Sequence, residues 1–393
     1  MRVIQVYNKR LTWGGEDLSI ENTIRILEIH GNEVSYWSQD VQKVKPAVNG
    51  KIGLFFSGIY SQKTAGHAYQ LIKDFKPEIV HAHNLYPQFS PSVLNEFQRN
   101  GIPTVWHPHD QRPMCPTGLS LYKGRVCEKC TDSGEHWCVI RNCRNNILES
   151  ISYAVRNFIH RRFKIYQHYA DMTIVWSEFL RQRLLKEGFS PNRTMVVPHP
   201  IRLPNQTINP SGNKYIAYLG RISKEKGIRE LIASAKIYPI PLKIAGDYSK
   251  YRQIIRSAPK NIEFVGWLSR SRIPDFIKGA RFGVMPSVCF ETFPTVALEF
   301  MGFGVPVIGS DIGGIPEVII DGETGLLSKP NDPETLAEKI KFLWDRPKLC
   351  FEMGNKARLL LEERYSDELY YQTLMGAYEK AKKIRMDSFR KNF

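Results

Sequence analysis

The sequence predicts an α/β protein of two domains, each built on a parallel β-sheet covered by helices. Short apolar strand segments alternate with amphipathic helical segments, and this alternation runs twice along the chain. A Pro- and Asn-rich stretch with neither pattern, residues 198–214, separates the two runs and is interpreted as a linker. The chain has 393 residues, 42% of them hydrophobic, which is enough to bury two cores.

The first run opens with a β-α-β unit. Residues 2–7 (RVIQVY) form an apolar strand, residues 18–31 an amphipathic helix ended by Gly31, and residues 32–38 the next strand. A loop with a Gly-Gly pair, NKRLTWGGED, joins the first strand to the helix. Three more strands of the buried type follow, which predicts a parallel sheet covered on both faces. They lie in the segments 77–84, 102–110 and 170–177.

The second run repeats the pattern after the linker. Helices are expected from about Gly227 and after Pro294, and a further helical region ends the chain. Parallel sheets bind ligands at the carboxyl ends of their strands, so two such domains predict an active site in a cleft between them. The strands of this run are expected at 215–220, 241–246, 261–266, 282–287 and 305–310.

The charge balance predicts anionic partners. Lys and Arg number 55 against 39 Asp and Glu, a formal net charge of +16, which suits phosphates, nucleotides, acidic lipid surfaces or nucleic acid. Positive charge is most concentrated in segment 155–170 and in the C-terminal tail. The first is either a solvated helix face or a peripheral contact with an anionic membrane. It combines the cations Arg156, Arg161, Arg162 and Lys164 with Val155, Phe158, Ile159, Phe163 and Tyr166 at helical spacing.

No apolar run approaches the roughly 18 residues of a membrane span, and residues 1–10 have no secretory apolar region. We therefore expect a cytoplasmic protein, with the inner face of the membrane as the alternative place of action.

The stretch ETFPTVALE places Glu291 and Glu299 eight positions apart with no other charge between them. An unpaired buried carboxylate is costly, so the pair needs solvent or a ligand. Upstream, Arg221 and Lys226 lie between a strand and a helix, where two cations form a diphosphate clamp unless they are ordinary surface charges. Pro294 fits the first turn of the following helix. We infer that the two acids accept hydrogen bonds from sugar hydroxyls on either side of a diphosphate.

The segment PSVCFETFPTVALEFMGFGVPVIGSDIGGIPEVIIDGETGLL resembles the donor-binding region of the retaining group 1, or family 4, glycosyltransferases. The likeness lies in the two glutamates separated by seven residues, the strand GVPVIGS after them and the turn GGIPE. GRISKEKG is similar to the family's phosphate-binding loop, and TWGGED, VHAHN, HPHD and IVWSEFLRQRL are similar to segments of its acceptor domain. The resemblance covers almost the whole chain.

The resemblance implies the GT-B fold, two Rossmann-like domains facing a cleft. Residues 1–200 would bind the acceptor and residues 201–370 the nucleotide-sugar donor. The basic helix and tail, 371–393, would pack back on the first domain. The reaction implied is transfer of a sugar from a nucleotide sugar, either UDP- or GDP-linked, to a hydroxyl with retention at the anomeric carbon. No Asp-x-Asp motif is present, which agrees with catalysis that needs no metal.

Site roles are carried over on the matching positions. Arg221 and Lys226 would bind the diphosphate, Glu299 the ribose hydroxyls and Glu291 the donor sugar. The resemblance names His109, Glu291 and Lys226 as catalytic and places His109 and Asp110 on the acceptor side. The family often has Gly where this chain has Pro294, which removes one backbone donor. The donor loops would be completed by Gly14, Gly15, Thr292, Phe293, Pro294 and Thr295.

Cysteines concentrate in segment 115–143, which holds five of the chain's seven. In an intracellular protein this density favours structural zinc over disulfides, with reduced thiols or a redox pair as alternatives. A subset of the family is similar in its Cys-Pro, Cys-x-x-Cys and Cys layout. That likeness implies Cys115, Cys127, Cys130 and Cys143 as ligands, leaves Cys138 out and lets His136 substitute for one. Cys289 and Cys350 are expected to be ordinary thiols. His81, His83 and His199 are expected to be structural, although His81 or His83 could touch the acceptor.

The predicted function is a glycosyltransferase for a cell-surface polysaccharide or glycolipid, with a glycan or lipid-linked acceptor. A sugar-nucleotide epimerase or a phosphorylase with the same fold is an alternative, but no cofactor-lysine motif of a phosphorylase is found. A zinc-containing nucleic-acid-binding protein is a third hypothesis. It is disfavoured because the positive charge does not form a concentrated stripe with interleaved aromatic residues.

Overall fold

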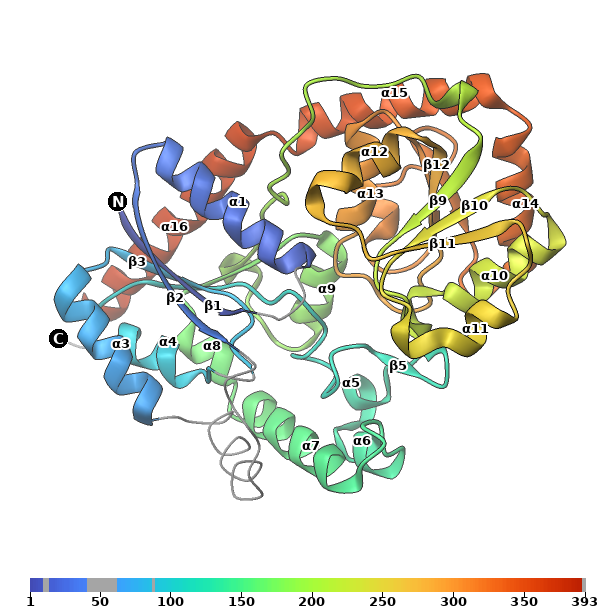
Figure 1. Cartoon of the computed structure of the whole chain (residues 1–393). Helices are drawn as coiled ribbons and strands as arrows, with labels where there is room; N and C mark the ends of the chain where they lie inside the picture. The colour runs from blue at the N-terminus through green and yellow to red at the C-terminus, as the bar shows by residue number, and fades with distance from the viewer. Residues whose placement is uncertain (10–13, 41–61, 87–88, 391–393) are drawn as a thin grey trace. The chain divides into compact units, whose positions relative to one another are not determined.

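The computed structural model describes residues 1–9, 14–40, 62–86 and 89–390 (Figure 1). The chain divides into two compact units. Unit 1 comprises Met1–Ser120, Glu128–Pro200 and Asp367–Phe393, and unit 2 comprises Leu121–Cys127 and Ile201–Ser366. Within the predicted loop TWGGED, Thr12 and Trp13 lie outside the described residues.

Unit 1 is built on a parallel six-stranded sheet in the order β2-β1-β3-β4-β7-β8. Its strands are β1 (Arg2–Lys9), β2 (Glu33–Asp40), β3 (Ile79–Ala82), β4 (Thr104–Trp106), β7 (Met172–Val175) and β8 (Thr194–Val196). The described helices that accompany it are α1 (Gly15–Ile29), α3 (Gln62–Phe75), α4 (Ser92–Arg99), α5 (Lys129–Ser133), α6 (His136–Ile140), α7 (Ile147–Arg162), α8 (Ile165–Tyr169), α9 (Glu178–Lys186) and α16 (Asp367–Arg390).

Both faces of this sheet are buried. Neighbouring strand residues point to opposite sides, and the residues on each side join a separate apolar cluster. Ile4 and Val80 join one apolar cluster with side chains of α3, α4 and α9. Val3 and Ile79, one position away, join a second cluster with Tyr370, Leu374 and Tyr378 of α16 and with side chains of α1. The last helix of the described chain therefore completes the core of the first sheet, and Figure 1 shows α16, in red, beside the blue strands.

Polar contacts fix α16 on this face. Arg385 forms an ion pair with the buried Asp171, which also accepts a hydrogen bond from the backbone amide of Thr104 at 2.9 Å. The hydroxyl of Tyr378, which is fully buried, lies 2.9 Å from Nδ1 of His81. These bonds tie the helix to the starts and the middle of the central strands.

Unit 2 holds a second parallel six-stranded sheet, in the order β11-β10-β9-β12-β13-β14. Its strands are β9 (Tyr215–Leu219), β10 (Leu242–Ala245), β11 (Ile262–Gly266), β12 (Ala280–Met285), β13 (Val307–Ser310) and β14 (Gly325–Ser328). The helices are α10 (Ile228–Ile237), α11 (Arg252–Arg256), α12 (Ile273–Lys278), α13 (Thr295–Gly302), α14 (Pro333–Trp344) and α15 (Pro347–Arg364). From the centre of the sheet, β10 and β11 are added on the side of β9, and β13 and β14 on the side of β12. The strand order therefore reverses between β9 and β12.

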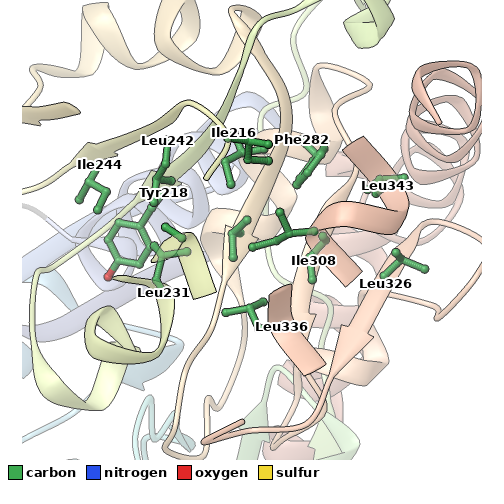
Figure 2. Packing of buried hydrophobic residues seen from close by; sticks show 14 of the residues in the cluster. Ile216, Tyr218, Leu231, Leu242, Ile244, Phe282, Ile308, Leu326, Leu336 and Leu343 are labelled. Carbon is green, nitrogen blue, oxygen red and sulfur yellow. The ribbon is translucent and has the colours of Figure 1, made fainter. Parts of the chain in front are cut away.

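A core of unit 2 lies between this sheet and the helices α10, α14 and α15. Figure 2 shows Ile216, Leu242, Phe282 and Ile308 of the strands meeting Leu231, Leu336 and Leu343 of the helices. On the opposite face, Gly283 lets the ring of Phe300 in α13 approach β12, because a Cβ there would lie 2.9 Å from the ring. The absence of a side chain at this position thus seats the helix that carries Glu299.

Unit 2 also includes a short antiparallel hairpin from the middle of the sequence, β5 (Leu121–Tyr122) and β6 (Arg125–Val126). Its turn residues, Lys123 and Gly124, both have positive φ, 49° and 79°, which suits the twist of a two-residue hairpin. The segment that follows returns to unit 1 at Glu128.

The strand and helix segments predicted for both runs are confirmed, and β8 and β14 are strands that the sequence pattern did not single out. Segment 155–170 is corrected. The helix stops at Arg162, Lys164 takes a positive φ of 48°, and α8 begins at Ile165. Arg156 is buried while Val155 and Phe158 are exposed, the reverse of a solvated basic face over an apolar one. None of the helices in the described ranges is long and apolar enough to span a bilayer.

Removal of the Tyr378 hydroxyl should destabilise the protein. Tyr378→Phe leaves the buried His81 Nδ1 without its 2.9 Å partner, and we expect a loss of about 1–2 kcal/mol in the free energy of unfolding. Urea denaturation measures it. The control is Tyr371→Phe on the same helix, whose hydroxyl makes only a 3.4 Å contact with Asn32 in a half-buried position. An equal loss in both variants would contradict the assignment.

Candidate functional site

The candidate site of unit 2 is formed by two loops that leave adjacent strands where the sheet order reverses. One loop follows β9 and contains the 3₁₀ turn Lys224–Lys226, and the other follows β12 and leads to α13. They touch closely, because Gly227 has a φ of 70° and a Cβ there would lie 1.7 Å from the carbonyl oxygen of Pro286. The amide of Val288 donates to the carbonyl of Glu225 at 3.0 Å. Glycine at this position is therefore required for the loops to meet.

This contact brings Lys226 and Glu291 together. Lys226 Nζ donates to Glu291 Oε1 at 2.6 Å, and the hydroxyl of Ser287 donates to the same oxygen at 2.6 Å. The side chains are 25% and 11% exposed, so the pair is largely shielded but open on one side. Oε2 of Glu291 has no hydrogen-bond partner within the described ranges. The loops thus present an ammonium group and a carboxylate oxygen side by side.

A third loop holds Glu291 from behind. The amide of Gly314, in the turn after β13, donates to the carbonyl of Glu291 at 2.8 Å. Gly313 has a φ of 64°, and a Cβ there would lie 2.6 Å from the same carbonyl oxygen. The GGIPE turn therefore serves in this structure to position the backbone of Glu291.

Glu299 lies in the second turn of α13 and is partly buried. Burial raises the pKa of its carboxyl to about 7, and the positive charge of Arg270 acts in the opposite direction. No hydrogen bond to this carboxylate is found in the described part of the chain. Glu299 is therefore a shielded acid with free acceptor capacity, unlike the paired Glu291.

Arg221 occupies a different environment from Lys226. Its side chain is 69% exposed and lies 3.7 Å from the carboxylate of Glu225. The loop backbone is nevertheless fixed, since the hydroxyl of Tyr218 donates to the carbonyl of Arg221 at 2.6 Å. The structure does not bring the Arg221 guanidinium into the Lys226–Glu291 pair.

Pro294 stands at the N-cap of α13, before the first turn in which the sequence placed it. Two of the first three amides of the helix are engaged locally, that of Thr295 with Phe293 and that of Ala297 with Pro294. Phe293 is buried against the ring of Tyr365, whereas Thr292 and Thr295 are partly buried. The start of α13 therefore offers fewer open N–H donors than the motif alone implied.

In unit 1, Gly14 is the N-cap of α1 and Gly15 its first residue. The amide of Gly14 donates to the Asp17 carboxylate at 3.0 Å. This leaves the Gly-Gly pair at a helix N-terminus, the position that favours an approaching anion.

His109 belongs to a group of buried histidines at the ends of β3 and β4. Its Nε2 lies 2.9 Å from Nδ1 of His83, whose Nε2 lies 2.8 Å from Gln5 Oε1. Because an amide oxygen only accepts, His83 Nε2–H donates to it, and Nδ1 of this neutral ring accepts from His109 Nε2–H. Nδ1 of His109 lies 3.7 Å from the carboxylate of Glu16 in α1.

Burial keeps the rings of His81, His83, His107 and His199 neutral. It lowers the pKa of His81 and of His199 to about 3 and lowers the pKa values of His83 and His107 well below the usual range. His81 and His83 are fully buried, which agrees with structural roles. Nitrogens of His81, His83 and His107 lie within 4.8 Å of one another, but the ring of His81 is stacked on the other two. Stacked rings do not aim their lone pairs at one ion, so we assign no metal there.

Asp110 forms an ion pair with Arg112 and accepts a long hydrogen bond, 3.4 Å, from Asn84. Asn84 also accepts from the backbone amide of His109 at 3.0 Å. His109 and Asp110 are thus held by the same asparagine.

The cysteines of unit 1 are gathered but do not form a complete metal site. Cys138 and Cys143 share a hydrogen bond, which lowers the pKa of the Cys143 thiol to about 7, and Cys130 and Cys115 are near enough to act electrostatically on Cys138. Across the described residues of unit 1, no three cysteine sulfurs lie within 4.8 Å of one another. Cys127 falls in unit 2. Zinc therefore stays a prediction, which metal analysis of protein never exposed to chelator would check.

Sequence analysis missed four contributors. They are Ser287, Arg270, Glu16 and Gln5, and each is distant in sequence from the residue it contacts except Ser287. The position of Glu16 directly after the Gly-Gly pair is the one signal that could have drawn attention to it.

Comparison with known proteins gives consistent matches over both units. Residues 13–203 match the family model Glycosyltransferase Family 4, and residues 202–360 match Glycosyl transferases group 1. An uncharacterised glycosyltransferase of Methanocaldococcus jannaschii is 30% identical over 202 residues, 50% of this chain and 56% of the relative. The capsular polysaccharide biosynthesis glycosyltransferase CapM of Staphylococcus aureus is 30% identical over 175 residues, 42% of this chain and 46% of CapM. The chain thus spans about half the length of these curated relatives.

Solved structures share the fold at low identity. Sucrose-phosphate synthase from Thermosynechococcus elongatus has a TM-score of 0.71 at 16% identity, covering 96% of this chain and 98% of the other. Anabaena HepE in complex with UDP and glucose has a TM-score of 0.66 at 16% identity, covering 96% and 99%. With two parallel-sheet domains and both family models matched from residue 13 to residue 360, the chain belongs to the group 1, or family 4, glycosyltransferases of the GT-B fold.

Proposed function

We propose that this protein transfers a sugar from a nucleotide-sugar donor to a hydroxyl of a glycan or lipid-linked acceptor, with retention at the anomeric carbon. The observation that carries the proposal is the group of Lys226, Ser287 and Glu291, assembled where the sheet order of unit 2 reverses. Ligands of such sheets bind at this point. An ammonium group beside an acceptor oxygen matches a diphosphate joined to a sugar, because one partner recognises phosphate and the other hydroxyl groups.

Lys226 supports departure of the nucleotide. Its ammonium has three donors, of which Glu291 takes one, so the others are available to phosphate oxygens. Negative charge grows on the leaving diphosphate as the glycosidic bond breaks, and a fixed cation stabilises that charge. Arg221, which is exposed in this structure, is proposed as the second phosphate ligand.

The two glutamates divide the recognition of hydroxyl groups. Glu291 offers Oε2 to the transferred sugar while Ser287 and Lys226 hold Oε1. Glu299 is proposed to accept hydrogen bonds from the ribose diol, since its carboxylate is shielded and has unused acceptor capacity. No metal is required in this scheme because protein cations balance the phosphate charge.

For the acceptor side, we propose that unit 1 acts through His109 Nδ1 and Asp110. His83 occupies Nε2 of His109, and Nδ1, which lies 3.7 Å from the carboxylate of Glu16, is the nitrogen proposed to act on the substrate. Gly14 and Gly15 present the start of α1 to the diphosphate. CapM, a relative, is named for capsular polysaccharide biosynthesis, which supports a role in cell-surface polysaccharide or glycolipid synthesis.

We further propose that α6 and α7 contact an anionic membrane. The exposed apolar side chains of α7 form a stripe at helical spacing, Ile140 of α6 extends the set, and the cations Arg141, Arg144 and Arg162 belong to the same stretch of sequence. An apolar row flanked by cations suits the boundary between acyl chains and acidic headgroups. The stripe comprises Ile140, Ile147, Leu148, Ile151, Val155 and Phe158.

Substitutions in the donor loops should separate binding from catalysis. Glu291→Gln and Lys226→Ala should each lower kcat by about 10- to 100-fold, because each removes a charge-assisted bond at the reacting groups. Glu299→Gln should mainly raise the KM for the nucleotide sugar, by about tenfold. The matched controls are Glu263→Gln and Lys243→Ala, which alter an exposed ion pair between β10 and β11.

Steady-state kinetics follow a thermal-shift screen of UDP- and GDP-sugars, in which a ligand at 100 times its Kd stabilises by about 2.7 kcal/mol. Folded donor-loop variants with kinetics equal to the controls would show that the donor binds elsewhere.

Donor affinity should depend on pH through Glu299. Its pKa of about 7 in the free protein should fall on binding, because ribose hydroxyls bond best to the ionised carboxylate. Binding therefore releases a proton, and the Kd should rise by up to about tenfold per pH unit as the pH falls below about 7. Titration calorimetry from pH 5.5 to 8 with a nucleotide sugar measures this. Glu299→Gln should give a flat profile, and parallel profiles for both proteins would exclude Glu299 as the cause.

Membrane contact should require both the stripe and lipid charge. Liposomes with acidic headgroups should sediment the protein, neutral liposomes should not, and high salt should reduce the bound fraction. The double variant Leu148→Ser with Phe158→Ser should lower binding at least fivefold. The control Leu359→Ser, at an exposed position of α15, should not. Equal binding to neutral liposomes, or no effect of the double variant, would refute the contact.

A further inference from the structure

Unit 1 contains a cavity of about 40 Å³ at the carboxyl ends of β3 and β4, bounded by α7 and α8. A water molecule needs roughly 10–15 Å³ on this measure, so the cavity holds about three water-sized atoms. Its walls include Tyr86, Trp106, Arg112, Arg156, Asn157 and Tyr166. None of these residues was singled out for the donor site, and Arg156 was noted in the sequence only as part of a basic segment.

Residues that line the cavity carry buried hydrogen-bond donors without partners in the described structure. Within the described ranges, Nη1 of Arg156, Nδ2 of Asn157 and Nε1 of Trp106 are buried and have no hydrogen-bond partner. Each of these residues is only 3% exposed. An unpaired buried donor is costly, and three around one cavity point to a ligand that supplies acceptors.

The ion pairs of the arginines around the cavity limit the class of ligand further. Arg112 is paired with Asp110, and Arg161 is paired with Glu135 and Glu187, at 2.8 Å in both cases. Arg156 is different, because in the described structure no carboxylate pairs with it.

Arg156 instead donates to the carbonyl of Pro116 at 3.3 Å and lies over the rings of Tyr86 and Tyr153, at 3.9 and 4.8 Å. Burial raises the pKa of Tyr86 to about 12, so its hydroxyl is no counter-ion near neutral pH. The arginine remains charged because its ordinary pKa is far above neutrality. Among the described residues Arg156 therefore has no acidic partner of its own, although the second glutamate at Arg161 balances its charge over the cavity as a whole.

We propose that this cavity binds the carboxylate of an acidic sugar in the acceptor, held by Arg156 with Asn157 and Trp106. A carboxylate supplies acceptors only, carries one negative charge and has three heavy atoms, which matches the donors, the guanidinium of Arg156 that no described carboxylate pairs with, and the space. A phosphate monoester is larger and carries about 1.5 to 2 negative charges at pH 7.

The cavity also adjoins the residues assigned to the acceptor side. Asn84 lines it and bonds both the amide of His109 and the carboxylate of Asp110. That the sugar belongs to the acceptor rests on the proposed function, whereas the carboxylate site itself does not.

The test compares glucuronate with glucose, its neutral counterpart, by saturation-transfer NMR on the full-length protein at constant ionic strength. Glucuronate should bind and glucose should bind at least tenfold more weakly. Arg156→Gln should raise the Kd for glucuronate at least tenfold, and Arg156→Lys should give an intermediate loss because it keeps the charge without the planar fork. The matched control is Arg162→Gln, an exposed arginine on the same helix, which should bind like wild type. Circular dichroism confirms folding.

Each outcome is decisive. Equal binding of glucuronate and glucose, binding of phosphate without glucuronate, or unchanged affinity in Arg156→Gln and Arg156→Lys would overturn the proposal. Acetate that competes as well as glucuronate would overturn the sugar part. If Arg156→Gln does not fold, Arg156→Lys and Asn157→Ala carry the comparison. Stabilisation by nucleotide sugars is measured on the same proteins. Its absence alongside glucuronate binding would reject the donor assignment and leave the cavity proposal standing.

Discussion

The candidate donor site depends on the close approach of two backbones, Gly227 after β9 and Pro286 after β12. A side chain at Gly227 would occupy the position of a carbonyl oxygen, and its φ of 70° is one that glycine adopts at little cost. Only because the two loops touch can Lys226 reach Glu291 at 2.6 Å. The sheet order places the two strands side by side, and the absence of a Cβ at Gly227 lets the loops that follow them come into contact. The loop chemistry of unit 2 is therefore set by a residue that contributes no functional group.

Unit 1 uses a different principle, a buried group of imidazoles. Five histidines lie at 8% exposure or less around the ends of β3 and β4, His81, His83, His107, His109 and His199. Charged rings so close together would repel one another and lose their hydration, so burial favours the neutral forms. A neutral imidazole has one donor and one acceptor, so the bond from His83 to Gln5 decides which nitrogen of His83 accepts from His109. The position of His109 is thus decided by residues that do not face the site.

The sequence was most informative where local pattern and motif coincide. The strands around β9 and β12 alternate clearly with helices, and Glu291 with Glu299 has a spacing specific enough to indicate the family, which the family models confirm. Contacts between distant segments could not be inferred. The local sequence does not distinguish the buried Arg156 from the exposed Arg162, because burial depends on how α7 packs over the loops after β3 and β4. For the same reason the cysteine spacing did not show that Cys138 would be the partner of Cys143.

The return of α16 to unit 1 has a consequence for the order of folding during synthesis. Unit 2 is nearly continuous in sequence, so almost all of it leaves the ribosome before α16 does. Unit 1 lacks Tyr370, Leu374 and Tyr378 on one face of its sheet until then. At about 5–20 residues per second, translation of Ile201–Ser366 takes on the order of ten seconds or more. For that time the nascent sheet exposes apolar side chains that the mature protein hides, which makes it a natural client for a chaperone that holds unfinished chains.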